Sequence, residues 1–571
     1  MISKRLRAME YYLKEDPKDR KIAYFSLEIG LKPEIPTYSG GLGVLAGDTI
    51  KSFADKGIPA VAVTLLYEKG YFHQELEDGN QKEVPVNWDK AKHLKLLDSR
   101  VNIKLEGRDI LLQVWLYVVE GVKGNVVPVL FLDSNLEKNS EEDRALTRNL
   151  YGGDRRYRLL QEALLGIGGV RMLQALGHED LEKYHMNEGH AALLTLELMN
   201  RHRQDLDKVR EMCVFTTHTP VPAGHDSFEI DLAKSVLRDF TNVDELHHNN
   251  IIDHENKLNM TYLALHHSHY INGVAKKHGE VSKKMFPGYS IEAITNGVHA
   301  PSWVSDPMAK LFDKYIPSWR TDELTLRYAL GLPKDKVWEA HQKAKKKLLD
   351  FVNQKMGTHM KEDVFTIGFA RRAATYKRGN LIFTDRKRLL EIYKTAGKFQ
   401  IIFGGKAHPH DGGGKEIIKN IWDNIQELKG KIDIVYLPNY EMFLGKLLTS
   451  GVDIWLNNPL RPREASGTSG MKAALNGVPQ FSVLDGWWLE GHVEGMTGWA
   501  IGPRPSHVEE EVDQDKDIED LYNKLEQQIL PTYYKNQEKW KDIMKHCIGV
   551  NGSFFNTQRM IAQYVTNAYF K

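Results

Sequence analysis

The sequence predicts an α/β protein made of two doubly wound, Rossmann-like domains that face a central cleft. Its 571 residues exceed the size at which one hydrophobic core keeps growing, so at least two domains are expected. Short β-branched and aromatic runs alternate with amphipathic segments, which is typical of parallel strands joined by crossover helices. We place an N-terminal domain at 1–300 and a C-terminal domain at 301–571, with the last helix crossing back to the first domain.

Each half contains five predicted strands. Those of the first half are residues 22–27, 60–66, 127–132, 213–217 and 291–295, and those of the second are 365–370, 400–404, 432–437, 454–456 and 480–483. Helices are predicted at 157–176 and 191–201, and a long Lys/Glu-rich helix at 335–355 separates the two series. Ligands bind beyond the carboxyl ends of strands in open α/β sheets, so two facing sheets would share a cleft.

Composition excludes several classes of protein. The 77 Lys and Arg residues balance 76 Asp and Glu residues, which leaves no net field for nucleic acid or an anionic membrane. Cys213 and Cys547 are too few for a disulfide framework. No apolar run approaches the roughly 18 residues of a membrane span, and the first residues lack the apolar stretch of a signal peptide. We therefore expect a cytoplasmic protein.

The segment 464–476, Glu-Ala-Ser-Gly-Thr-Ser-Gly-Met-Lys-Ala-Ala-Leu-Asn, is the most informative part of the chain. Lys472 follows a Gly/Ser/Thr turn of the kind that presents backbone N–H groups to an anion. A lysine amine beside an anion cradle suits a phosphorylated aldehyde cofactor. The same cluster is also typical of an ordinary helix cap, and the segment alone leaves both interpretations open.

Two further segments could hold phosphate. A glycine loop at 39–43 precedes a predicted helix, where the backbone can approach an anion, although a plain tight turn has the same composition. Arg371, Arg372, Lys377 and Arg378 place four cations directly after a predicted strand. Arginine forks and a lysine charge are suited to phosphate, and a solvated basic turn is the alternative.

Several histidines lie near predicted strand ends or in pairs. They are His190, His218, His225, His247, His248, His266, His267 and His269. None has a standard zinc spacing and no cysteine pair supports them, so we expect no metal site.

Together, these segments resemble the α-glucan phosphorylases, that is, the glycogen, starch and maltodextrin phosphorylases. The resemblance follows nearly the whole chain in order, and the block 464–476 matches the family's pyridoxal-phosphate attachment motif at every defining position. The shared motifs are residues 24–28, 39–43, 187–190, 217–219, 296–297 with Trp303, 371–378, 404–407, 464–476, 484–486 and 559–564.

This resemblance implies a GT-B type glycosyltransferase fold and a glycosyltransferase activity. The reaction would be a reversible, retaining phosphorolysis that releases the non-reducing-end glucose of an α-1,4-glucan as glucose 1-phosphate. Inorganic phosphate would protonate the leaving oxygen and attack carbon 1 from the same face, with the 5′-phosphate of pyridoxal 5′-phosphate as its proton partner. The implied partners are α-glucan, inorganic phosphate and glucose 1-phosphate, and a homodimer is typical of the family.

The resemblance also assigns roles to individual residues. Those implied in cofactor binding are Lys472, Thr468, Ser469, Arg371, Tyr440, Gly41, Tyr24 and Trp303. The substrate phosphate would be bound by Gly41, Arg372 and Lys377, and the glucosyl unit by Asn296, His218, Glu464, Ser466 and Gly467. The catalytic set would be Lys472, Arg372, Lys377, His218 and Glu464.

The chain departs from the long phosphorylases in ways typical of a short, microbial-type branch. Their N-terminal regulatory segment has no evident counterpart, so we expect no control by serine phosphorylation or AMP. Arg371 stands where lysine is usual, and Glu441 stands where arginine is common. Asp411 falls near the position of a tyrosine that contacts the acceptor sugar, so we expect a different acceptor subsite.

The predicted fold is also compatible with two other functions. A nucleotide-sugar-dependent glucan synthase could share the fold, but it has no use for Lys472 within its full motif. A catalytically silent glucan-binding relative would be free to lose Lys472, Glu464, Arg372 and Lys377, all of which are present.

Overall fold

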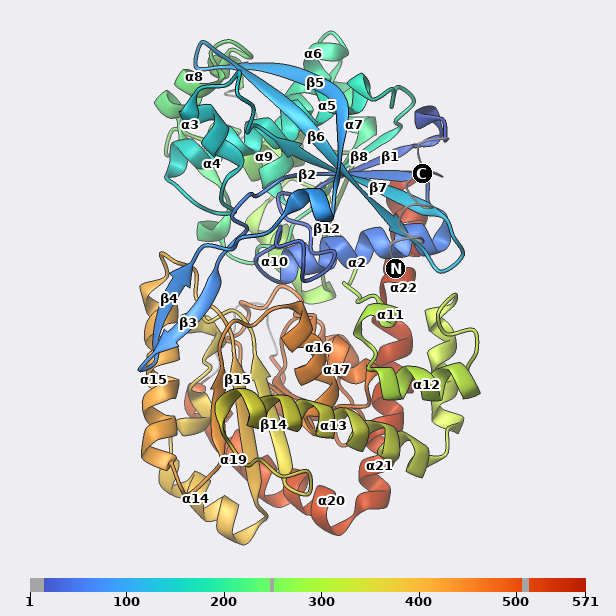
Figure 1. Ribbon diagram of the computed structural model, residues 1–571, viewed down its shortest axis with the longest axis vertical. Coiled ribbons are helices and arrows are strands. Elements are labelled where there is room, and N and C mark those ends of the chain that lie inside the picture. Colours follow the sequence, from blue (N-terminus) through green and yellow to red (C-terminus); the bar gives the residue numbers. More distant parts are fainter. Residues whose placement is uncertain (1–14, 247–250, 506–512, 571) are drawn as a thin grey trace.

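The computed structural model describes residues 15–246, 251–505 and 513–570. Two large sheets, one from each half of the chain, lie one above the other in the long direction of the molecule (Figure 1). Helices flank both sheets, as the doubly wound pattern predicts. The predicted α/β class and its two Rossmann-like sheets are therefore confirmed.

The first sheet has nine strands within the described residues, in the order β13-β12-β9-β8-β1-β2-β7-β6-β5. The strands from β13 to β7 are parallel, and β6 and β5 extend that edge in antiparallel fashion. Their bounds are β1 Ile22–Phe25, β2 Ala60–Leu65, β5 Lys95–Leu105, β6 Arg108–Glu120, β7 Val126–Asp133, β8 Lys183–Asn187, β9 Cys213–Thr216, β12 Tyr270–Gly273 and β13 Glu292–Ala293. The order reverses between β1 and β8, which is where such sheets bind ligands.

The second sheet is parallel throughout its six described strands, in the order β16-β15-β14-β17-β18-β19. This is the 3-2-1-4-5-6 order of the dinucleotide-binding fold, with its switch point between β14 and β17. The strands are β14 Phe365–Ala370, β15 Phe399–Gly404, β16 Ile434–Leu437, β17 Ile454–Asn457, β18 Gln480–Val483 and β19 Gly498–Ile501.

The helices connect and cover these strands. Those of the first half are α2 Gly41–Lys56, α3 Glu141–Arg144, α4 Arg155–Ala163, α5 Gly169–Ala175, α6 Leu193–Arg201, α7 Leu206–Met212, α8 Ile230–Leu237, α9 Met260–His266 and α10 Lys276–Met285. Those of the second half are α11 Ala300–Trp303, α12 Asp306–Tyr315, α13 Lys334–Met356, α14 Arg386–Thr395, α15 Gly412–Leu428, α16 Met442–Gly451, α17 Ser469–Leu475, α18 Trp488–Gly491, α19 Gln514–Lys524, α20 Leu530–Lys535, α21 Gln537–His546 and α22 Thr557–Tyr564.

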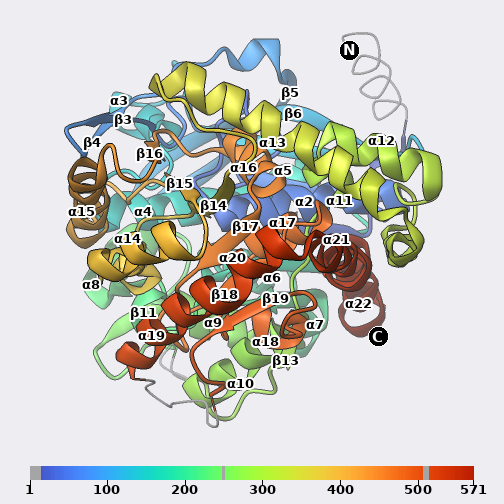
Figure 2. The same cartoon turned by 90° about the horizontal axis from the view of Figure 1, so that it is seen from below.

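Alternating side chains of the second sheet build a core on each of its faces. In β15, Ile401 and Phe403 belong to a cluster that includes residues of α14, α15 and α19. Ile402 belongs to a different cluster, with residues of α13 and α16. Because successive side chains of a strand point to opposite faces, these two clusters lie on opposite sides of the sheet. Figure 2 shows helices on both of these sides.

Most of the predicted elements are present. All ten predicted strands overlap observed ones, and the predicted helix 335–355 is α13. The predicted helix 157–176 is α4 and α5, joined by a π-helical turn at Leu164–Gly168. Strand β8, which pairs with β1 near the middle of the first sheet, was not predicted, because its sequence Lys-Tyr-His-Met-Asn contains no β-branched residue. Strands β5, β6, β12 and β19 were also missed.

Besides the point where the chain passes from the first half to the second, two segments connect the halves. The end of the chain returns to the first sheet, where Tyr569 hydrogen-bonds His185 at 2.6 Å and Tyr564 hydrogen-bonds Thr216 at 3.1 Å. On another side, the strands β3 (His73–Glu77) and β4 (Asn80–Val84) form a hairpin that projects from the first half to α15 (Figure 1). We call this hairpin the arm.

Two buried glutamines of the arm bind the backbone that follows β15. Gln74 donates from Nε2 to the carbonyl of Gly405 at 2.8 Å. Gln81 accepts from the N–H of Ala407 at 2.9 Å and donates to its carbonyl at 3.0 Å. The arm therefore fixes a loop of the second half from the first half. No helix within 15–246, 251–505 or 513–570 has the length and apolar run needed to cross a membrane.

Candidate active site

A cavity of about 490 Å³ is lined by residues of both halves of the chain. Its walls come from the ends of strands and the starts of helices at the two switch points. Glu28 follows β1, Gly41 begins α2, His218 follows β9, Arg371 follows β14 and Lys472 lies in α17. This is the location expected for a ligand site in facing α/β sheets.

With the exception of Tyr24, every residue predicted for the site lines this cavity. They are Gly41, His218, Asn296, Trp303, Arg371, Arg372, Lys377, Tyr440, Glu464, Ser466, Gly467, Thr468, Ser469 and Lys472. The structure thus brings together three segments that were separate in the sequence: the glycine loop, the basic segment and the lysine turn.

Tyr24 lies elsewhere. It is a central residue of β1, only 3% exposed, and its ring packs edge-on against Phe53 of α2 and His185 of β8. It is not a lining residue of the cavity, so the expected contact with a cofactor has no support in the geometry. Within the motif 24–28, the residue that reaches the cavity is Glu28.

Lys472 is buried beside an aromatic ring. Its Nζ lies 3.7 Å from the centre of the Trp303 ring, and the indole N–H of Trp303 donates to Asp48 at 2.6 Å. Burial lowers the pKa of Lys472 to about 8, although the nearby negative charge of Asp48 acts to raise it. About a tenth of this amine is therefore uncharged at pH 7, and the uncharged form can act as a nucleophile.

Lys472 lines the cavity together with Trp303, Tyr440, Gly445 and Thr468. A Cβ placed on Gly445 would lie 3.3 Å from the Tyr440 hydroxyl and 3.6 Å from the Trp303 ring, so both side chains approach the α16 backbone here. Thr468, at the start of α17, uses no side-chain hydrogen bond to cap that helix. These groups fit an aromatic aldehyde attached to the lysine, with a negatively charged substituent near Thr468.

Glu464 is held by two cations. Its Oε2 accepts hydrogen bonds from Arg371 and from Lys377, the latter at 2.6 Å. Burial alone would raise the pKa of Glu464, but the charges of Arg371 and Lys377 lower it to about 2. Glu464 is therefore a carboxylate at all physiological pH values.

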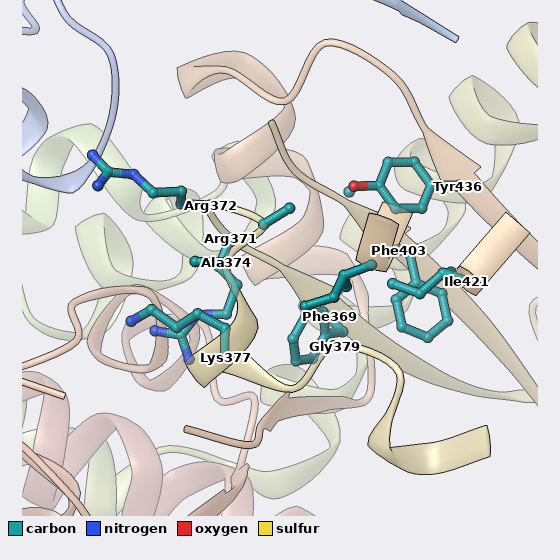
Figure 3. A pocket seen from close by; sticks show the side chains of 12 residues that line it. Phe369, Arg371, Arg372, Ala374, Lys377, Gly379, Phe403, Ile421 and Tyr436 are labelled. Atoms are coloured by element: carbon teal, nitrogen blue, oxygen red, sulfur yellow. The ribbon is translucent and has the colours of Figure 1, made fainter. Parts of the chain in front are cut away.

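Arg372 faces the glycine loop from the other half of the chain. A Cβ on Gly40 would lie 3.9 Å from Nη2 of Arg372, whereas a Cβ on Gly41 would meet no described atom within 4 Å. Figure 3 shows that Arg372 and Lys377 point away from the rings of Phe403 and Tyr436, which lie on the other side of the strand end. Arg372 and the amino end of α2 thus converge on the same space, which favours an anion.

Glu28 was not predicted as a site residue, yet it organises the glycine loop. Its Oε2 accepts from the backbone N–H of Gly40 at 3.2 Å, and both of its oxygens lie 3.1 Å from the Ser39 hydroxyl. The Tyr151 hydroxyl donates to Oε1 at 2.8 Å. A Cβ on Gly43 would lie 2.8 Å from Cβ of Tyr38 and 2.6 Å from Oε2 of Glu28, so this position requires glycine. The sequence signal was an acidic residue directly after the first strand.

His218 is neutral in this environment. Burial lowers its pKa well below the ordinary value, and the neighbouring histidines add to that effect. Its ring Nε2–H donates to Oδ1 of Asn187 at 2.7 Å. The pKa of His190 is likewise lowered to about 3 by burial, and its Nε2 accepts from the N–H of Leu27 at 3.0 Å.

The remaining histidines do not form a metal site in the described part of the chain. His247 and His248 lie outside the described residues. Among residues 15–246, 251–505 and 513–570, no group of three or more His, Cys, Asp or Glu side chains is arranged to hold a metal ion.

Asp411, expected near the acceptor sugar, is the N-cap of α15. Its Oδ1 accepts from the N–H of Gly414 at 2.8 Å, and the residue does not line the cavity. His408 and Lys406 of the same loop do line it, as does Glu441. Of the departures seen in the sequence, Arg371 and Glu441 therefore line the cavity and Asp411 does not.

Comparison with known proteins agrees with this geometry. The family model for carbohydrate phosphorylases matches residues 33–111 and 179–494. The chain is 39% identical to maltodextrin phosphorylase of Thermococcus litoralis, over 97% of this chain and 71% of that protein. It is 36% identical to glycogen phosphorylase of Mycobacterium tuberculosis, over 96% and 70%, and 34% identical to glycogen phosphorylase of Aquifex aeolicus, over 98% and 87%. The predicted resemblance and the GT-B type fold are confirmed, and the chain belongs to the carbohydrate phosphorylase family.

Proposed function

We propose that this enzyme is an α-glucan phosphorylase that uses pyridoxal 5′-phosphate. It would transfer the non-reducing-end glucose of an α-1,4-glucan to inorganic phosphate, reversibly and with retention, and release glucose 1-phosphate. The observation that carries the proposal is the presence of two anion-binding arrangements and a buried lysine in one cavity.

The cofactor would be held by the lysine side of the cavity. Lys472 would attach it, Trp303 and Tyr440 would contact its ring, and Thr468, Ser469 and Arg371 would bind its phosphate. When bound, pyridoxal phosphate would supply its 5′-phosphate as the acid–base partner of the substrate phosphate. The lowered pKa of Lys472, about 8, supports attachment because the uncharged amine is the reactive form.

The substrate phosphate would be bound by Arg372, Lys377 and the amino end of α2 at Gly41. Two phosphate groups a few ångström apart repel each other by several kcal/mol at an intermediate dielectric. Arg371, Arg372 and Lys377 offset this repulsion in a site whose dipoles are fixed before the substrate arrives. The chain therefore contributes charge stabilisation, and no protein carboxylate has to act as nucleophile.

Two of the polar groups that would bind the glucosyl unit have no hydrogen-bond partner among the described residues. Oδ1 of Asn296 and Oγ of Ser466 are buried and lack a hydrogen-bond partner among the described residues. Buried polar atoms of this kind are costly unless a ligand satisfies them. The carboxylate of Glu464, next to Gly467, can accept from sugar hydroxyls, and His218 lies in the same wall. A sugar rich in hydroxyl groups meets all of these requirements.

Two other functions fit the cavity less well. A nucleotide-sugar-dependent glucan synthase would require neither the buried amine of Lys472 nor the aromatic ring of Trp303 beside it. A silent glucan-binding relative would not need the ion-paired cluster of Arg371, Lys377 and Glu464. Retention of the whole constellation favours an active phosphorylase.

The cofactor can be tested directly by spectroscopy. Protein purified with pyridoxal phosphate should show a near-ultraviolet absorbance band that borohydride treatment alters and makes resistant to dialysis. Protein without any such band, after incubation with the cofactor, would refute the proposal. Initial rates with maltodextrins of increasing length would then define the preferred glucan.

A further inference from the structure

Glu188 combines a position in the cavity wall with a backbone conformation that side chains rarely adopt. Its φ of 81° and ψ of 166° lie in a region populated almost only by glycine. Such strain persists only where surrounding contacts enforce it, and it often marks a functional constraint. The residue lines the cavity together with His218 and Thr219.

We propose that Glu188 is a positioning residue that holds the segment His218–Thr219 against the glucosyl side of the site, and that this task accounts for its strained backbone. The inference rests on the proposed function, because it takes His218 as a contact of the glucosyl unit. It assigns no role in bond breaking to the carboxylate.

The strand register explains why the strain is needed. Strands β8 and β9 run parallel, and Asn187, the last residue of β8, pairs with Thr216. Regular extension of β8 would point the side chains of residues 187 and 188 to opposite faces. Both nevertheless contact the same residue, since Asn187 binds the ring of His218 and Glu188 binds its backbone. The positive φ at Glu188 breaks the alternation and lets two successive side chains reach one neighbour.

The carboxylate of Glu188 accepts three hydrogen bonds, two of them from the segment His218–Thr219. Its Oε2 accepts from the backbone N–H of His218 at 2.7 Å and from the hydroxyl of Thr219 at 3.0 Å. Its Oε1 accepts from the N–H of Gly189 at 3.0 Å. The N–H of Glu188 itself donates to the carbonyl of Thr216 at 2.9 Å, which anchors the turn to β9. Hydrogen bonds to a charged acceptor are among the stronger ones in proteins.

A substitution at Glu188 can distinguish its effect on stability from its effect on activity. Glu188→Gly removes the carboxylate and at the same time relieves the backbone, because glycine adopts this conformation freely. Relief of the backbone strain offsets the loss of the hydrogen bonds that the carboxylate accepts, so we expect the thermal unfolding midpoint to stay close to that of the wild type. We expect kcat/KM for maltodextrin to fall by about tenfold or more, as the loss of two charge-assisted hydrogen bonds implies, with less than about a twofold change in KM for phosphate.

Two further variants complete the experiment. Glu188→Gln keeps the side-chain shape and the strain, so it should lose less activity than Glu188→Gly and gain no stability. Gln204 is exposed, does not line the cavity, and also has a left-handed backbone conformation, with φ of 64°. Gln204→Gly should therefore gain stability without any change in activity.

The outcomes are distinct. If Glu188→Gly has the same kcat/KM for maltodextrin as the wild type, the inference is wrong. It is also wrong if the thermal midpoint of this variant falls together with its activity. Wild-type protein that forms no glucose 1-phosphate would instead overturn the proposed function, and the positioning role with it. Reduced kcat/KM in a Glu188→Gly variant of undiminished stability supports the inference.

Discussion

Replacing Glu464 with glutamine tests how the charged cluster of the active site contributes to stability. The carboxylate is 12% exposed and pairs with Arg371 and Lys377. These cations lower its pKa from 4.5 to about 2, although burial alone would raise it. A shift of this size corresponds to about 3 kcal/mol of stability at neutral pH. Glu464→Gln should therefore lower the free energy of unfolding by up to about 3 kcal/mol at pH 7.

The pH dependence gives the sign of the effect. Because the folded-state pKa lies below the unfolded value, the stabilisation is fully present above pH 4.5 and is lost as the pH falls through the folded pKa of about 2. The stability difference between wild type and Glu464→Gln should be constant above pH 4.5 and shrink below it. Urea unfolding followed by tryptophan fluorescence at several pH values measures this difference.

A matched control uses an exposed ion pair. Glu339 is half exposed and bonded to Lys336, so Glu339→Gln should change the stability by less than about 1 kcal/mol. Glu464→Gln should also lower kcat/KM for the glucan by about 10- to 100-fold, if the carboxylate binds a sugar hydroxyl. A variant as stable as wild type at pH 7, or a stability difference that does not shrink in acid, would refute the reasoning.

Three other substitutions test separate parts of the site. Lys472→Ala should lose both the cofactor absorbance band and glucose 1-phosphate formation, and a cofactor-loaded, active variant would contradict its role. Arg372→Ala should raise KM for phosphate by about tenfold or more, because it removes a charge-assisted contact. Its effect on KM for the glucan should be smaller, and equal effects on the two KM values would argue against a phosphate-binding role. Gln81→Ala breaks the two hydrogen bonds that join Gln81 to Ala407 of the second half and leaves the N–H of Ala407 without its partner. It should cost about 2 kcal/mol in urea unfolding, whereas Gln426→Ala on the exposed face of α15 should cost little. Equal stability of these two glutamine variants would show that the arm does not fasten the two halves.

The overall architecture was predictable because its strands carry strong local signals. Phe365–Ala370 and Phe399–Gly404 are buried apolar runs, and α13 is a long helix between two strand series. Strand β8 lacked such a signal: Lys183–Asn187 is buried because its neighbours cover it, although its own residues include lysine, histidine and asparagine. Tertiary packing overrode local propensity at that place.

The sequence predicted those site residues whose role depends on their own charge or on the backbone flexibility of glycine. The turn before Lys472 and the cations around Arg372 follow strands, and the fold brings strand ends together. Glu28 and Glu188 escaped prediction because their importance lies in which backbone N–H groups they accept from, and that depends on loops distant in sequence. Tyr24 was assigned to the site with its motif, but its place inside β1 directs it into the core.

The central claim is tested most directly by the product formed from a maltodextrin in inorganic phosphate. The holoenzyme should release glucose 1-phosphate of the α configuration, at a rate that depends on phosphate and falls to background when the protein is freed of pyridoxal phosphate. Release of free glucose, or no sugar phosphate at all with cofactor and phosphate present, would contradict the account.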